Sequence, residues 1–180
     1  MDHVQQSNDY HPDDITQIGE LGLQLLDTLS AYHQKSRALL YQLALSVGVW
    51  IAQHKGRLFK IDFIVNGLAQ AANKTQDTMA LSFLYEACTY IIPACDANIR
   101  ADLDKSHGGR PWRILIMNYG IIATRTHNPD LMASAFKTLL KYFPEEAAHF
   151  FKQGLSEMSR LNYPKHVRAV MKRYAQLKRV

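Results

Sequence analysis

Apolar residues recur at steps of three and four positions along most of the chain, which is the spacing of one face of an α-helix. The alternation of apolar and polar positions that marks a half-buried strand is almost absent. The segment after Pro12 shows the helical spacing best, and its apolar members are Ile15, Ile18, Leu21, Gly22, Leu25, Leu26 and Leu29. The pattern predicts an all-α fold.

Proline, glycine and short polar residues divide the chain into about nine helices. Ser36 and Thr75 are the expected N-caps of the second and fourth helices. The connections are short, so we expect antiparallel packing of neighbouring helices, as a stack of helical hairpins or as an irregular bundle. We expect a flexible acidic N-terminus over 1–12 and a single all-α domain over 13–180. The predicted helices cover about 12–29, 36–54, 59–72, 75–92, 94–105, 111–125, 129–142, 144–162 and 164 to near the C-terminus.

The longest apolar run covers 38–52 and is 15 residues long. A membrane-spanning helix needs about 20 residues, so we predict no stable membrane insertion and expect this helix to be fully buried in the core. Basic residues on both sides of the run keep a helix lying in a membrane surface as the alternative. The N-terminus lacks the pattern of a secretory signal, and Cys88 and Cys95 are too few for a disulfide scaffold. These features predict a cytoplasmic protein.

Charge is distributed unevenly along a chain whose formal net charge is +5. Residues 1–34 contain six acidic side chains and no Lys or Arg, whereas 164–180 contain Lys and Arg but no acid. The asymmetry fits two faces with different partners, attraction between the first and last helices, or solvated faces with no partner.

A weak internal similarity relates two stretches of the chain. Gly120 lies 53 positions after Gly67, and both fall inside apolar helices where close helix packing explains a glycine. The Met, Ala and Phe that follow in each copy are expected to face inward, and chance similarity between amphipathic helices is the alternative. The aligned pairs are Asp77 with Asp130, Met79 with Met132, Ala80 with Ala133 and Phe83 with Phe136.

Paired helices, short turns, Pro or Asp at helix starts and small residues inside helices resemble the architecture of HEAT and armadillo repeats. The spacing of 53 positions between the matching glycines is longer than the ~40–47 residues usual for those repeats. The resemblance implies a scaffold that binds partners on a curved face, and it assigns no residue a catalytic role.

The segment 105–113 is the first candidate site, for an anion or for a partner. Its glycines allow close approach of a ligand, its basic side chains supply charge, and the following helix offers free N–H groups. The alternative is an ordinary inter-helix loop with its tryptophan packed inward. The candidate residues are Lys105, Ser106, His107, Gly108, Gly109, Arg110, Trp112 and Arg113.

The last helix is the second candidate site. One of its faces is apolar, and another is basic and suits phosphates, an anionic membrane or an acidic partner. The alternative is a terminal core helix with a solvated basic face. The basic residues are Lys165, Arg168, Lys172, Arg173 and Arg179.

Catalytic and metal-binding patterns are weak. Glu146 and His149 form a Glu-x-x-His pair on a helix, but a di-iron site needs more helical acids than the chain supplies. This shortage of ligands predicts no metal site. There is also no nucleophile elbow and no Cys–His pair placed by the sequence, so we predict no cofactor and lean away from an enzyme.

We therefore predict a non-enzymatic protein–protein interaction module, either a scaffold or an accessory factor. The alternative is a nucleic-acid or phosphate-ligand binding protein that uses the 105–113 loop and the basic C-terminal helix. The expected partner is another protein, with nucleic acid as the alternative, and the sequence leaves the oligomeric state open.

Overall fold

The computed structural model describes residues 10–103 and 108–177. These two stretches contain nine α-helices, which confirms the all-α fold. A one-turn 3-10 helix, Gln34–Ser36, joins the first two. The helices are α1 (Pro12–Tyr32), α2 (Arg37–Gln53), α3 (Asp62–Lys74), α4 (Thr78–Ala94), α5 (Ala97–Ala101), α6 (Pro111–Arg125), α7 (Pro129–Tyr142), α8 (Pro144–Arg160) and α9 (Lys165–Ala175).

Proline and short polar side chains begin most of these helices. A proline occupies the first turn of α1, α6, α7 and α8, where its missing N–H costs no hydrogen bond. The carboxylate of Asp77 caps α4 by accepting from the N–H groups of Met79 at 3.1 Å and Ala80 at 3.2 Å. The expected cap of α4 is therefore corrected, since Thr75 precedes the true cap. Ser36 occupies the N-cap position of α2 as expected, but its side chain makes no capping hydrogen bond.

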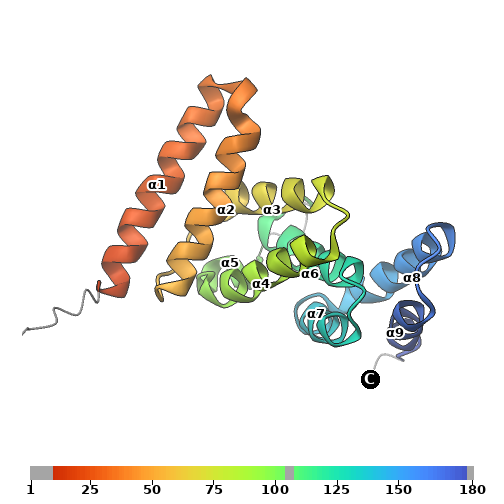
Figure 1. Cartoon of the computed structure of the whole chain (residues 1–180). Coiled ribbons are helices and arrows are strands. Elements are labelled where there is room, and N and C mark those ends of the chain that lie inside the picture. Colours follow the sequence, from red (N-terminus) through yellow and green to blue (C-terminus); the bar gives the residue numbers. More distant parts are fainter. Residues whose placement is uncertain (1–9, 104–107, 178–180) are drawn as a thin grey trace, which may run out of the picture.

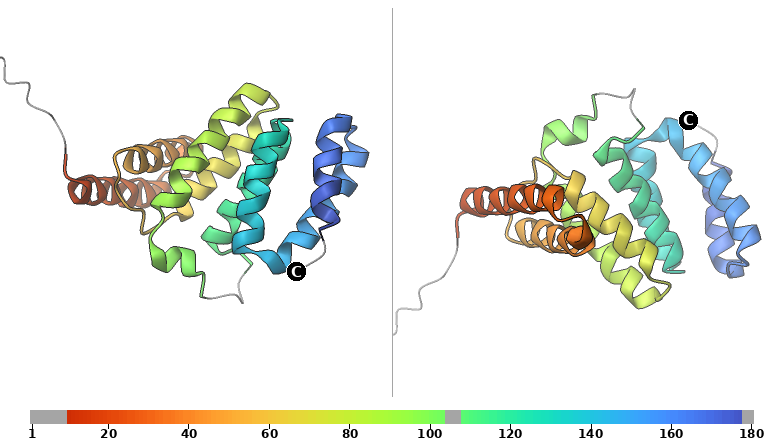
Figure 2. Two further views of the ribbon diagram at one scale, coloured as in Figure 1. Left: turned by 90° about the horizontal axis from the view of Figure 1, so that it is seen from below. Right: turned by 90° about the horizontal axis from the view of Figure 1, so that it is seen from above.

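The helices pack in sequence order across the molecule. α1 and α2 form a long hairpin at one end, and α2 rests on α3 and α4 (Figure 1). α6 packs against α3, α4 and α7, while α8 and α9 pair at the other end and contact α7 (Figure 2). The hairpin of α1 and α2 is thus attached to the rest of the molecule mainly through one side of α2.

Glycine permits a close contact between α2 and α3. A Cβ atom on Gly67 of α3 would lie 2.2 Å from the backbone carbonyl oxygen of Tyr41 on α2. That distance is far inside van der Waals contact, and a backbone atom cannot rotate away as a side chain can. Gly48 of α2 meets α3 in the same contact, since its Cβ would lie 2.7 Å from Ile64 Cδ1.

The expectation that α2 is fully buried is wrong. Leu39 and Leu43 keep 57% and 44% of their surface exposed, whereas Ala44 and Ile51 of the same helix are fully buried. The reason is geometric, because α1, α3 and α4 contact part of the α2 circumference and leave one side of it open.

The expectation that both copies of the internal similarity face inward is wrong for the first copy. Met79 and Phe83 of α4 are 67% and 64% exposed, whereas Met132 and Phe136 of α7 are completely buried. Phe136 is covered by aromatic rings of α8 and α9, with Phe151 at 5.0 Å and Tyr174 at 5.1 Å between ring centroids. Equal spacing in the sequence therefore does not give equal environments, and the HEAT-like resemblance stays a prediction.

Two further expectations concern helix length. The fifth helix spans only Ala97–Ala101 instead of 94–105, because Asp96 caps it and Asp102 ends it in the left-handed conformation with φ of 46°. No helix in the described part of the chain is long and apolar enough to cross a membrane.

Candidate interaction surface

The two arginines at the start of α6, Arg110 and Arg113, are both paired with carboxylates. Lys105, Ser106 and His107 lie outside the described residues. Nε of Arg110 donates to both carboxylate oxygens of Asp102, at 2.9 and 2.8 Å, and both side chains are nearly buried.

Arg113 makes a similar contact with α8. Its Nε donates to the two carboxylate oxygens of Glu146 at 2.8 and 2.7 Å, its Nη2 contacts the same group, and its Nη1 donates to the Gly108 carbonyl at 3.1 Å. Hydrogen bonding to Arg113 lowers the pKa of Glu146, and the same bond raises the pKa of Arg113. Arginines at the N-cap and in the first turn of a helix oppose its dipole, and these carboxylates compensate their charge.

Trp112 belongs to the core. Its side chain is 2% exposed, and its ring meets that of Tyr142 edge to face with centroids 4.9 Å apart. The described part of the predicted loop site therefore consists of Gly108 and Gly109 at the surface, two carboxylate-paired arginines and a buried indole. This geometry ties α5, α6 and α8 together.

α9 presents its cations differently. Val167, Met171 and Tyr174 are buried, and the Tyr174 hydroxyl donates to the Ala133 carbonyl of α7 at 3.2 Å. Lys165, Lys172 and Arg173 are exposed, Arg168 is half-buried, and none of the four forms an ion pair with another described residue. Arg179 lies outside the described residues. The basic face of α9 is therefore available to a partner. Arg110 and Arg113 are not, because carboxylates already pair with them.

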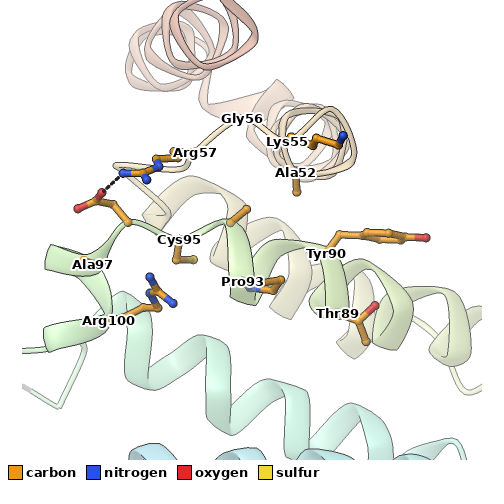
Figure 3. Close-up of a pocket in the computed structure, with 12 residues that line it drawn as sticks. Ala52, Lys55, Gly56, Arg57, Thr89, Tyr90, Pro93, Cys95, Ala97 and Arg100 are labelled. Carbon is orange, nitrogen blue, oxygen red and sulfur yellow. Dashed lines mark ion pairs between the residues drawn. The ribbon is translucent and has the colours of Figure 1, made fainter. Parts of the chain in front are cut away.

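A second cluster of cations, which the sequence did not suggest, surrounds a cavity of about 410 Å³ between the end of α2 and the junction of α4 and α5 (Figure 3). Arg57 lies 3.7 Å from the carboxylate of Asp96 and is largely exposed. Lys55 and Arg100 line the same cavity and form no ion pair with a described residue. The cavity carries more positive than negative charge, so a small anion is the ligand that suits it.

The hairpin of α1 and α2 exposes apolar side chains at helical spacing. On α1, one side packs on the body of the protein, where Thr16 Oγ1 and a Glu20 carboxylate oxygen each accept a backbone N–H from the loop 57–59 at 2.9 Å. Leu25 lies on another side and is 59% exposed. Helical spacing places further apolar side chains beside it, namely Ile18, Gly22, Leu29 and Tyr32.

α2 adds a parallel stripe. Ile51 faces α1, since a Cβ on Gly19 would lie 2.3 Å from its Cδ1, and Gly48 faces α3. The remaining arc of α2 carries Leu39, Leu43, Ser46 and Trp50, and helical geometry puts it on the same side of the hairpin as the α1 stripe. We call the two stripes together the hairpin face: Ile18, Gly22, Leu25, Leu29, Tyr32, Leu39, Leu43, Ser46 and Trp50.

The sequence pattern of α1 indicates this face. α1 carries two apolar stripes, and one stripe is enough to attach a helix to its neighbour. The buried stripe includes Ile15, Gly19 and Leu23, so the larger stripe with Leu25 and Leu29 is left over.

Metal and thiol chemistry have little support in the described residues. No group of three or more His, Cys, Asp or Glu side chains there is placed to hold a metal ion. Cys88 and Cys95 are both unpaired and buried, and burial raises the pKa of the Cys95 thiol to about 12.

Comparisons with known proteins give no relative from which a role could be transferred. No family model matches the chain, and neither a curated protein nor a solved structure matches it. The class that the fold supports is an all-α helical protein, and its function has to be argued from its own surface.

Proposed function

We propose that this chain is a non-enzymatic α-helical protein–protein interaction module, a scaffold or accessory factor, whose hairpin face docks against helices of a protein partner. One observation carries the proposal. Leucine and isoleucine side chains at helical spacing are exposed along both α1 and α2, although the same helices bury a separate apolar stripe.

Exposure of this extent argues for a partner because it costs free energy without one. Single exposed leucines are ordinary, but a contiguous apolar patch beyond a few hundred Å² is rare on monomeric proteins. α1 is also held to the body by hydrogen bonds from the loop 57–59, so the face is presented by an anchored hairpin. Such a helical surface suits an amphipathic helix or a helix pair.

Two finer features belong to the same proposal. Helices that pair through small residues such as Gly67 and Gly48 suit a HEAT-like stack, in which an end pair presents a face to a partner. Cys88 and Cys95, both unpaired and buried, suit a reducing compartment such as the cytoplasm.

The test is quantitative capture from the native lysate with tagged wild type and two matched variants. Leu25→Glu puts a charge at the centre of the hairpin face, and Gln24→Glu puts the same charge on the neighbouring position, which lines the cavity toward α3. We expect wild type and Gln24→Glu to capture the same protein in equal amounts; this protein can be an untagged copy of the chain itself. Leu25→Glu should capture at least about tenfold less of it. Equal capture by all three would contradict the proposal.

We propose anion binding as a second candidate function, for a nucleic acid or a phosphate-bearing ligand. The observation in its favour is the set of cations on α9, most of them exposed, that form no ion pair with another described residue. The cavity beside Lys55 and Arg100 adds a smaller positive site. Reversal of Arg168 and Lys172 to Glu should weaken nucleic-acid binding and flatten its dependence on salt. Binding that is unchanged by this reversal would remove the α9 candidate.

A further inference from the structure

The hairpin face has the spacing of a coiled-coil seam. Along α1 its positions follow one another by four, three, four and three residues, from Ile18 to Tyr32. Along α2 they follow by four, three and four, from Leu39 to Trp50. Alternating steps of three and four keep a stripe facing a partner helix over several turns, and they permit side chains to interlock as knobs into holes.

The face has the area that a stable complex needs. Ile18, Leu25, Leu39 and Tyr32 are more than half exposed, and Leu29 and Leu43 more than a third. Together these side chains leave several hundred Å² of mostly apolar surface in water, which is the order of the ~800 Å² that each partner buries in an interface of standard size.

Charge argues against a lipid surface as the occupant. No side chain of the hairpin face is ionisable except the Tyr32 hydroxyl, and α1 contains Asp13, Asp14, Glu20 and Asp27 but no Lys or Arg. Helices that lie in a membrane surface are typically rich in Lys and Arg on their polar side, because lipid headgroups are often anionic. α1 would be repelled by such headgroups. Lys35 and Arg37 at the tip of the hairpin would be attracted, but Arg37 lines the cavity on the α3 side and not the hairpin face.

A second helical hairpin with the same apolar stripes is a suitable partner for the hairpin face. Two antiparallel helices with apolar seams at three-four spacing form half of a four-helix bundle, and the missing half is another such pair. The chain itself supplies that pair, because a two-fold axis brings the same uncharged stripe onto itself and buries it on both copies.

We propose that the hairpin face binds a second copy of this chain, with α1 and α2 of the two copies forming an antiparallel four-helix bundle. This inference rests on the proposed function and names the partner of that same surface. Figure 2 places α9 at the end of the chain opposite to the α1–α2 hairpin. A dimer formed through the hairpins would therefore leave both α9 helices away from its interface.

Sedimentation velocity of purified wild type over a concentration series up to roughly 100 µM tests this directly, because a complex with micromolar Kd is well populated there. We expect a monomer–dimer equilibrium. The double variant Leu25→Glu with Leu43→Glu should raise the dimer Kd by at least about 100-fold, since two charges per copy would be buried without a counter-ion. The matched control Met79→Glu with Phe83→Glu changes exposed apolar residues on α4 and should leave the dimer intact.

The outcomes separate this inference from the proposed function. If the wild type stays monomeric over the whole concentration series, the inference that a second copy binds the hairpin face is wrong. This result can be interpreted without any variant. If Leu25-dependent capture of a different protein is then found in lysate, the proposed function stands without the dimer. A dimer that is insensitive to the Leu25 and Leu43 substitutions also overturns the inference, as does a monomer that co-sediments through this face with vesicles of phosphatidylcholine and phosphatidylserine.

Discussion

The guanidinium of Arg113 and the carboxylate of Glu146, 33 positions apart in the chain, form a two-oxygen ion pair that joins the first turn of α6 to the first turn of α8. Replacing Glu146 with Gln should lower the free energy of unfolding at neutral pH by about 1–3 kcal/mol, because Arg113 loses its charged partner. Chemical denaturation measures this. Glu86→Gln, at an exposed position on α4, should change stability by less than about 0.5 kcal/mol.

The pH dependence of that difference has a definite sign. The pKa of Glu146 is lowered in the folded protein by its hydrogen bond from Arg113, so the pair contributes stability above the ordinary Glu pKa. This contribution is lost as the pH falls through the lowered pKa. The stability difference between wild type and Glu146→Gln should therefore be largest at neutral pH and shrink below about pH 4. A difference that is constant between pH 7 and pH 3 would contradict the ion pair as its source.

Gly67 and Gly22 give opposite predictions for the same substitution. Gly67→Ala places a methyl group where the Tyr41 carbonyl stands, so α2 and α3 must separate, and we expect a loss of about 2 kcal/mol or more. A methyl group on Gly22 meets no atom within 4 Å. Because alanine favours helix over glycine, Gly22→Ala should gain up to about 1 kcal/mol. Thermal and denaturant unfolding at one protein concentration compare them, and equal effects would refute the close contact of α2 with α3.

The two thiols should be unreactive in the native protein. Burial raises the pKa of Cys88 and Cys95, so neither supplies the thiolate that attacks a disulfide reagent at pH 8. We expect slow labelling by a chromogenic disulfide reagent, fast labelling of both thiols in denaturant, and fast native labelling of a Gln24→Cys control at an exposed site. Rapid labelling of the wild type without denaturant would show that one of the helix ends around these cysteines opens readily.

Helix positions were largely predictable from the sequence because local chemistry decides them. Proline begins α1, α6, α7 and α8, and an Asp or Asn cap precedes α4, α5 and α7. The predicted range 111–125 coincides with α6. Thr75 was mistaken for a cap because threonine and aspartate both cap helices, and the choice of Asp77 depends on the backbone of the turn.

The environment of side chains was less predictable because tertiary contacts decide it. Arg110 and Arg113 read as candidate anion ligands because their carboxylates, Asp102 and Glu146, lie 8 and 33 positions away. The stripe with Leu25 was equally able to pack or to remain exposed, and the position of α3 on the other side of the hairpin leaves it open. No spacing rule along the chain contains that information.

Photo-crosslinking from single positions in the native cell tests the hairpin face as an interaction surface most directly. A benzophenone side chain at Leu25 or Leu43 reports what covers the face, and the same group at Gln24 is the matched position on the other side of α1. The account predicts one discrete adduct, with the mass of two chains, from Leu25 and Leu43 and not from Gln24. An absence of adducts from both leucines, or the same adducts from all three positions, would contradict a docking surface on α1 and α2.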